Sequence, residues 1–530
     1  MTTPKRILFI ENDPHLLRAV PRRLKLAGYE VITAASSEAA YDALAEELFH
    51  LAIIDIRVDD DRSVSDTSGF AIARQLPDTI PCIFHTAHDS KENIREALGA
   101  IGADDIIAKD DPEAPAKLVS RVNELFAAEV GVNFDLCLES PLSPTAIADQ
   151  IRLASSGPQP AAGDVELLFQ RLFVQARLVH VKPLLAAENA NLSQSGAALL
   201  KVQEERAQGA TAPVVLKLGD RAEITDEVQR YRTIKPFLGG QRLAQLEGES
   251  YSRSIGGVVY SLVGAQEDGA IHTLGEVLLT QEPEAMMALL QRFFHNTFGR
   301  IYMNAQPAEL DLTAHYTEAL HLTAPKLMRA MAPIWSEART APTLPMRTLD
   351  RALPNPLAQV LVDNEFRAWG ATPTRCCLVH GDLHSRNILV DEENQFWLID
   401  FARSGSSHIL RDLVELETDI KFRVLPELPL SALVNLEHAL AESATWMAPM
   451  PVVALPDPLD RAFALVCTIR QIAGELSGLD PLECIKQYEQ ALFWHTLNLL
   501  RFKTTTKQRQ WHGLVAAALL AEKFSGAGRG

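Results

Sequence analysis

Cysteines, long apolar runs and cationic residues are scarce in this 530-residue chain, and each scarcity argues against one class of protein. The six cysteines form no Cys-x-x-Cys pair, so we interpret them as reduced, buried thiols of a cytoplasmic protein. The longest late apolar run, 513–521, is too short to cross a bilayer. Charges also interrupt residues 1–13, where a signal peptide would be apolar. We therefore expect a soluble, cytoplasmic protein with no membrane partner.

Positive charge is outnumbered, with 50 Lys and Arg residues against 68 Asp and Glu residues and a formal net charge of -18. A nucleic-acid partner would select a basic face, so this balance argues against one. The hydrophobic content of 47% and the charged content of 22% are ordinary for globular proteins. Since the chain is too long for one core, two or three domains are expected.

The most informative stretch is 376–404, which alternates short apolar runs with polar residues. The apolar runs predict three strands, at 376–379, 388–390 and 396–399. We expect these strands to form a hairpin that brings Asp382, Asn387 and Asp400 to one edge. Phosphoryl transfer from Mg-ATP needs a carboxylate to orient the acceptor hydroxyl and hard oxygen ligands for magnesium. The three side chains can supply both.

The order His380-Gly381-Asp382, Asn387 and Ile399-Asp400-Phe401 resembles the HGDxxxxN and IDF-like hallmark of the aminoglycoside phosphotransferase and choline kinase superfamily. The resemblance implies that Asp382 is the catalytic base and that Asn387 and Asp400 hold Mg2+. Protein kinases carry His-Arg-Asp and Asp-Phe-Gly instead, which favours a small-molecule kinase lineage. The resemblance further implies a bilobal protein-kinase-like fold, ATP and Mg2+ as cofactors, and an acceptor with a hydroxyl group, either a small molecule or a protein.

One further acidic residue, Asp412, resembles an Asp of this superfamily that ties down the catalytic loop. A simple role at the N-terminus of the helix that begins near 410 is the alternative.

Residues upstream of this stretch match the nucleotide-binding half of such a fold. The loop 189–196 could cover ATP phosphates through its backbone, with Ser195 and Gly196 at its end, although it lacks a GxGxxG pattern. Lys217 is a lone cation in the apolar strand 214–218, and it matches the lysine that binds the nucleotide phosphates. Alternatively, it is an edge lysine that reaches water. Glu227, on the following helix, is its expected partner, with Glu223 as the neighbouring alternative.

Residues 1–128 alternate continuous apolar strands with amphipathic helices, which predicts a doubly wound parallel sheet. Polar residues collect at the carboxyl ends of the strands, where such sheets bind ligands: Glu11, Asn12, Asp13, Asp55, Thr86 and Lys109. The arrangement resembles the response-regulator receiver domain.

The receiver resemblance implies that Asp55 accepts a phosphoryl group from a sensor histidine kinase or phosphotransfer protein. By the same resemblance, Glu11, Asn12 and Asp55 hold Mg2+, Thr86 is the switch hydroxyl and Lys109 pairs with the phosphoryl oxygens. Asn12 replaces a carboxylate, Asp110 replaces the usual proline, and the segment 59–68 is long and acidic. A pseudo-receiver that keeps the fold without phosphorylation is therefore the alternative.

We therefore expect a multidomain chain of α/β plus α+β class. The predicted parts are a receiver at 1–128, a linker with a short helix at 129–164, a kinase-like N-lobe at 165–268, a C-lobe at 269–524 and a disordered tail at 525–530. The C-lobe includes the catalytic loop 378–403 and a helical acceptor subdomain. The expected function is a phosphorelay protein whose receiver regulates an ATP-dependent kinase. The alternative is a non-catalytic nucleotide-binding signalling scaffold with a pseudo-receiver.

Overall fold

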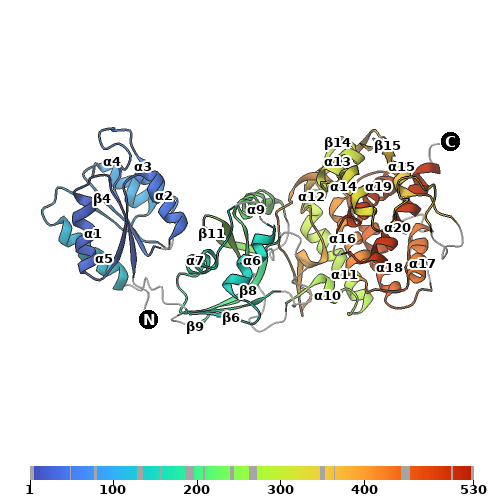
Figure 1. Cartoon of the computed structure of the whole chain (residues 1–530), viewed down its shortest axis with the longest axis horizontal. Coiled ribbons are helices and arrows are strands. Elements are labelled where there is room, and N and C mark those ends of the chain that lie inside the picture. Colours follow the sequence, from blue (N-terminus) through green and yellow to red (C-terminus); the bar gives the residue numbers. More distant parts are fainter. Residues whose placement is uncertain are drawn as a thin grey trace. The chain divides into compact units, whose positions relative to one another are not determined.

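The computed structural model describes residues 5–47, 49–76, 80–127, 135–154, 158–184, 196–206, 209–238, 244–261, 271–345, 352–362, 365–442, 454–502 and 505–526 (Figure 1). The chain divides into two compact units. One contains Met1–Thr225 and Gln245–Ser261, and the other contains Asp226–Ala244 and Leu262–Gly530. Among the helices of the described ranges, none combines the length and the apolarity needed to cross a membrane.

The first unit begins with a five-stranded, fully parallel sheet in the order β2-β1-β3-β4-β5, which confirms the predicted doubly wound sheet. Its strands are β1 (Arg6–Ile10), β2 (Glu30–Ala34), β3 (Leu51–Ile54), β4 (Cys82–Thr86) and β5 (Asp105–Ala108). The intervening helices are α1 (Leu16–Leu26), α2 (Ser37–Glu46), α3 (Ser68–Ala73), α4 (Lys91–Arg95), which continues as a π-helical turn (Glu96–Ile101), and α5 (Ala114–Ala127).

Alternation along the strands divides the side chains of this sheet between two cores, because successive residues of a strand point to opposite faces. Ile7, Phe9 and Ile53 pack with residues of α1 and α5 on one face. Leu8 and Ile54 pack with residues of α2 and α3 on the other. The sheet is thus buried on both sides, as its continuous apolar strands predict.

A second sheet in this unit has the order β11-β12-β10-β8-β7-β6, with β9 paired to β8. Its strands are β6 (Asp135–Leu138), β7 (Leu178–Pro183), β8 (Ala198–Arg206), β9 (Gly209–Ala210), β10 (Val214–Asp220), β11 (Gln245–Tyr251) and β12 (Ile255–Ser261). Strands β6 and β7 are parallel, and the other pairs are antiparallel.

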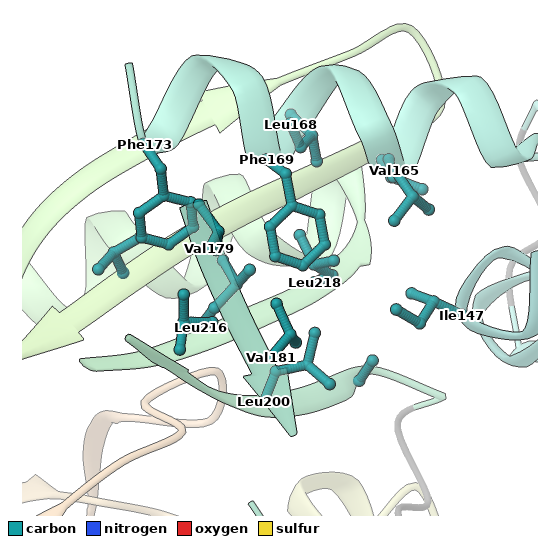
Figure 2. Packing of buried hydrophobic residues seen from close by; sticks show 14 of the residues in the cluster. Ile147, Val165, Leu168, Phe169, Phe173, Val179, Val181, Leu200, Leu216 and Leu218 are labelled. Atoms are coloured by element: carbon teal, nitrogen blue, oxygen red, sulfur yellow. The ribbon is translucent and has the colours of Figure 1, made fainter. Parts of the chain in front are cut away.

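The segment 129–164 is not simply the predicted linker, because two of its elements belong to this second sheet and its core. Strand β6 pairs with β7, and helix α6 (Pro144–Ala154) places Ile147, Ala148 and Ile151 in the core. Figure 2 shows Ile147 and the residues of α7 (Ala162–Leu172) facing side chains of β7, β8 and β10. Burial of these apolar side chains fixes both helices on one face of the sheet.

The second unit contains two separate three-stranded sheets, and this corrects the predicted single hairpin. Strand β17 (Ala371–Val379) pairs with β14 (Gln306–Asp311) and β20 (Gly405–His408). Strands β18 (Ile388–Asp391) and β19 (Phe396–Leu398) form a hairpin beside β13 (Ile271–Thr273). The loop that carries Asp382 therefore joins two different sheets.

The rest of the second unit is mainly helical within its described ranges. Its helices include α10 (Leu274–Val277), α11 (Pro283–Phe293), α12 (Gly299–Met303), α13 (Leu312–Ala319), α14 (Ala324–Met331), α15 (Pro356–Val360), α16 (Arg411–Asp419), α17 (Leu430–Glu442), α18 (Leu459–Leu476), α19 (Pro481–Leu499) and α20 (Lys507–Gly526). The two residues β15 (Leu361–Val362) pair with β16 (Glu365–Phe366). Helix α20 continues to Gly526, two residues into the predicted disordered tail.

Candidate functional site

The loop after β17 begins with a backbone turn that only glycine accommodates well. Gly381 has φ +81°, and a Cβ at this position would lie 2.1 Å from the carbonyl oxygen of Arg403. A side chain there would meet both the left-handed backbone and a fixed carbonyl. The glycine of the His-Gly-Asp sequence thus lets the loop approach the segment that follows Asp400.

Asp412, on α16, holds this loop in place through hydrogen bonds. Its two carboxylate oxygens accept the backbone N–H groups of His380 at 2.7 Å and of Gly381 at 2.8 Å. Arg411 donates to the Gly381 carbonyl at 2.8 Å. Burial raises the pKa of Asp412, and the interaction with His380 and the two N–H donors offset part of that rise. The expected tie-down role is confirmed by these contacts.

Asp382 and Asn387 lie together in the loop that Asp412 holds, as predicted. The Asn387 side-chain amide donates to the backbone carbonyl of Asp382 at 2.9 Å, so its Oδ1 is the atom left to bind a cation. The Asp382 side chain is 24% exposed, with His384 Nε2 at 4.0 Å and Arg403 Nη1 at 3.8 Å. Both distances exceed those of hydrogen bonds, so the carboxylate is held within a fixed loop without being locked to a cation.

Asp400 directly follows the β18–β19 hairpin and lies in the same neighbourhood. Its backbone adopts φ +66°, an uncommon conformation for a residue with a side chain. The His380 ring bonds the carbonyl of Ile399 at 3.1 Å, and the Ile399 N–H donates to Asn387 at 3.1 Å. These bonds connect the Asp382 loop, Asn387 and the residue before Asp400.

Helix α9 (Arg221–Ile234) contacts the segment after Asp400. The ring of Tyr231 meets that of Phe401 edge-on at 5.0 Å, and Phe401 also lies 5.1 Å from the His380 ring. Arg230 donates to the carbonyl of Ser404 at 2.8 Å. The position of α9 is thus coupled to the residues around Asp400.

The side chains predicted to hold Mg2+ are compatible with this ion in chemical type. Within the described ranges, no group of three or more His, Cys, Asp and Glu side chains is placed to hold a metal. Asn387 and Asp400 offer two hard oxygen donors instead. Magnesium bound with ATP takes one or two carboxylates and completes its coordination with phosphates and water, so a sparse protein donor set fits it.

Of the residues predicted to bind the nucleotide, Lys217 lies on a strand and Glu227 on a helix, whereas Gly196 lies just before β8. Lys217 is 3% exposed on β10, which pairs on both sides, so it is not an edge lysine. Glu227 on α9 is 1% exposed, whereas Glu223 is exposed. Gly196 has φ +67°. Ser195 lies outside the described residues.

In the five-stranded sheet, Glu11, Asp55 and Lys109 converge as predicted. The Lys109 ammonium lies 2.5 Å from Asp55 and 2.6 Å from Glu11. Burial alone lowers the pKa of Lys109, but the charges of Asp55 and Glu11 more than offset this and raise it. Burial raises the pKa of Glu11, and Lys109 opposes that rise. The three groups form one ionic cluster, in which both carboxylates are buried.

The other predicted receiver residues surround this cluster. Thr86 is buried at the end of β4, where its hydroxyl accepts the N–H of His88 at 3.1 Å. The Asn12 amide donates to the carbonyl of Arg57 at 3.1 Å, which leaves its oxygen as the possible metal ligand. Asp110 is exposed. The acidic segment 59–68 connects to the switch region through Asp61 and His88, at 3.0 Å.

Sequence reasoning missed the second carboxylate that supports the loop of Asp382. Asp419 accepts the N–H of Ser385 at 2.8 Å and pairs with Arg423 at 3.2 Å. The signal was present, because Asp412, Glu415 and Asp419 recur at helical spacing along α16. Acidic residues at this spacing, with the apolar Leu413, Val414 and Leu416 between them, indicate buried acceptors.

Comparisons with known proteins match two parts of the chain. A family model for the response regulator receiver domain matches residues 7–123. PhoB of Pseudomonas aeruginosa, a phosphate regulon transcriptional regulatory protein, is 29% identical over 123 residues, which are 22% of this chain and 50% of PhoB. KdpE of Mycobacterium tuberculosis, a transcriptional regulatory protein, is 33% identical over 105 residues, or 19% of this chain and 43% of KdpE. The chain thus spans about half the length of the curated relatives it matches.

Among solved structures, the chain is similar to a CheY-like response regulator receiver domain protein from Methanospirillum hungatei, with 29% identity and a TM-score of 0.21. The match covers 24% of this chain and 98% of that one. A second family model, ternary complex associated domain 9, matches residues 192–329 and 345–496, which together exceed half of the chain. The chain therefore carries a response regulator receiver domain at its N-terminal end and belongs to the ternary complex associated domain 9 family.

Proposed function

We propose that the region after the receiver is an ATP-dependent phosphotransferase that phosphorylates a hydroxyl group. The observation that carries this proposal is that the His-Gly-Asp loop is fixed by hydrogen bonds of its backbone. Two backbone N–H groups bind Asp412, while the neighbouring Asp382 carboxylate stays partly exposed and free of short ion pairs. A loop held rigidly below an accessible carboxylate is suited to positioning an acceptor.

In this proposal, Asp382 orients the acceptor hydroxyl and accepts its proton as the oxygen attacks the terminal phosphate of ATP. Asn387 and Asp400 would hold Mg2+, which supplies neutralisation of the phosphate charge when it is bound. Lys217 would bind the nucleotide phosphates, with Glu227 as the acid that orients it. The buried positions of both residues support these roles, because a buried charge needs a partner.

The direct test is Mg-dependent release of ADP across a panel of hydroxylated small molecules and candidate proteins. The variant Asp382→Asn keeps the shape of the side chain but removes the base. Asp460→Asn, at an exposed helix start, is the matched control. Stimulation by one acceptor in the native and Asp460→Asn proteins, but not in Asp382→Asn, is the expected result. Equal stimulation in all three would rule out Asp382 as the base.

We further propose that Asp55 is the phosphoacceptor of the receiver, supplied by a sensor histidine kinase or phosphotransfer protein. Lys109 already contacts Asp55, so it is placed to respond when the charge there changes. An acyl-phosphate donor should change the rate of ADP release in the native protein and leave Asp55→Ala unchanged. An identical response of the two proteins would mean that phosphorylation at Asp55 does not regulate transfer.

A non-catalytic nucleotide-binding scaffold is the second candidate, and the receiver provides the observation in its favour. Asn12 contributes one charge fewer than a carboxylate, and its amide already bonds Arg57. Tight ATP binding without transfer to any acceptor of the panel would favour the scaffold.

A further inference from the structure

We propose that a groove between helix α1 and strand β2 of the receiver, the α1–β2 groove, binds an acidic, extended segment of a partner protein. The segment adds to the outer edge of β2 as a further strand and places its carboxylates beside the cations of α1. None of the residues proposed for phosphoryl transfer or for phosphorylation of the receiver lines this groove, so its role is separate from both.

The α1–β2 groove has a volume of about 460 Å³ and combines apolar with basic side chains. The residues that line it are Leu17, Arg18, Pro21, Arg22, Lys25 and Leu26 from α1, and Val31 and Thr33 from β2. Pro21 and Val31 are buried, whereas Leu26 is 82% exposed. The groove therefore offers apolar surface that a bound segment can cover.

Every charged residue that lines the groove is basic. Helix α1 carries four cations and no acidic residue, in a chain whose formal net charge is -18. Arg18, Arg22 and Lys25 recur at helical spacing, so they form a row along one side of α1. The row extends over roughly 10 Å of the helix axis. Within the described part of the chain, no carboxylate forms an ion pair with any of the three.

Helix α5, which covers the same face of the sheet, provides an internal contrast. Its Lys117 pairs with Asp111 at 2.6 Å, and its Arg121 pairs with Asp105 at 3.3 Å and with Glu124 at 3.1 Å. Acidic groups of the protein thus balance the cations of α5. The cations of α1 have no such partners among the described residues, so an acidic ligand is the one that complements them.

Strand β2 contributes backbone groups that point out of the sheet. It is the outer strand, and within the described residues it pairs with β1 alone. The N–H of Glu30 and the carbonyl of Ala34 form hydrogen bonds on the β1 side, at 2.9 and 3.0 Å. Because successive residues of a strand direct their backbone groups to opposite edges, Val31 and Thr33 direct theirs away from β1. These are the two residues of β2 that line the groove.

An acidic segment in an extended conformation fits both features of the groove. A strand that adds to a sheet edge gains main-chain hydrogen bonds, and its alternate side chains face the same side. Four extended residues span roughly 10 Å, so carboxylates at alternate positions can reach the row of cations on α1. A basic segment would be repelled by this row, and a helical segment could not pair with the edge of β2.

The test measures binding of a defined peptide to the full chain by fluorescence anisotropy. The probe is fluorescein-labelled Glu-Val-Glu-Val-Glu-Val-Glu, and Lys-Val-Lys-Val-Lys-Val-Lys is the charge control. We expect the acidic peptide to bind and the basic peptide not to bind. Arg22→Gln combined with Lys25→Gln should weaken the binding about tenfold, as for loss of two exposed ion pairs. Lys91→Gln combined with Arg95→Gln removes two exposed cations from α4, and this matched control should bind as the native protein does.

Two forms of the acidic peptide, N-methylated either at the glutamates or at the valines, test the addition of a strand. In an added strand one set of N–H groups faces β2 and the other faces away from it. One form should therefore lose its binding and the other should keep it. Equal binding of the two forms, no binding of the unmodified peptide, or unchanged binding by the α1 double variant would overturn the proposal.

Two further measurements distinguish other occupants of the groove. A short single-stranded DNA that binds more tightly than the acidic peptide, and loses affinity in the α1 double variant, would assign the groove to nucleic acid. Self-association of the native chain in sedimentation velocity, absent from the α1 double variant, would assign the groove to a second copy of the chain. Either result would overturn an acidic segment of a partner protein as the occupant.

Discussion

Two aspartates at the ends of strands are held in opposite ways in this chain. Asp55 is 1% exposed, and the Lys109 ammonium lies 2.5 Å from it. Asp382 is 24% exposed, and the nearest described basic side chains, Arg403 and His384, lie at 3.8 and 4.0 Å from it. In the receiver, the side chain itself is paired. In the second unit, the backbone of the loop is fixed by Asp412 and the side chain is left accessible.

The difference matches the chemistry proposed for each residue. A carboxylate that is to be phosphorylated benefits from a neighbouring ammonium, which can stay with the new negative charge. A carboxylate that is to accept a proton must remain reachable by the acceptor, so a short ion pair would hinder it. Rigidity therefore comes from side-chain pairing at Asp55 and from backbone hydrogen bonds at Asp382.

The largest expected effect on stability comes from removing the basic side chain beside each aspartate. The two losses of stability should differ. Lys109→Met leaves Asp55 and Glu11 buried without their shared partner, so it should destabilise the receiver by about 3–5 kcal/mol. Arg403→Met should cost less than about 1 kcal/mol, because Arg403 is 44% exposed. Hydrogen exchange of peptides from each region across a denaturant series would measure both. Equal destabilisation by the two substitutions would contradict the contrast between the paired side chain of Asp55 and the accessible side chain of Asp382.

A second comparison uses the glycine beside each aspartate. A Cβ at Gly69 would lie 1.9 Å from the carbonyl of Asp55, and one at Gly381 would lie 2.1 Å from that of Arg403. Gly69→Ala should cost about 1–3 kcal/mol through overpacking. Gly381→Ala should cost roughly 1–2 kcal/mol more, because its φ is also positive. The same exchange measurement checks the order, and a larger loss at Gly69 would contradict it.

Acid should weaken both regions through buried neutral histidines. Burial lowers the pKa of His50 in the receiver to about 4 and that of His408 in the second unit to about 3. The unfolded chain takes up these protons as the pH falls below about 6.5, while the folded state resists until its own pKa. Each histidine therefore removes stability between about pH 6.5 and its folded pKa, amounting to about 2 kcal/mol at pH 5.

Hydrogen exchange at pH 7 and pH 5, corrected for intrinsic rates, measures this loss region by region. His50→Gln should reduce the pH dependence of receiver peptides without abolishing it, because burial also lowers the pKa of His85 to about 4, and it should not affect peptides around His408. His15→Gln, at an exposed position, is the control and should leave both unchanged. A receiver whose protection is equal at the two pH values would contradict the prediction.

The receiver site could be predicted from sequence because its geometry follows from one rule. Parallel strands end at the same edge, so Glu11, Asp55 and Lys109 must meet once the strands are identified. The short spacing from Asp382 to Asn387 likewise predicts their proximity within one loop. In both cases a local pattern determines which side chains come together.

The features that sequence reasoning missed depend on partners far along the chain. Strand β17 pairs with β14 and β20, although the next apolar runs in sequence suggested a hairpin. Strand β6 ends at Leu138 and pairs in parallel with β7, which begins only at Leu178, after helices α6 and α7. Such long-range packing leaves no periodic signal in the local sequence.

The most direct test of the account separates nucleotide binding from phosphoryl transfer at Asp382. With an acceptor identified, transfer from radiolabelled ATP is followed in the native protein and in Asp382→Asn, together with the affinity of each for Mg-ATP. The account predicts a loss of kcat of about 10²–10⁴-fold, the range expected for a general base, with little change in nucleotide affinity. Undiminished transfer by Asp382→Asn would contradict it.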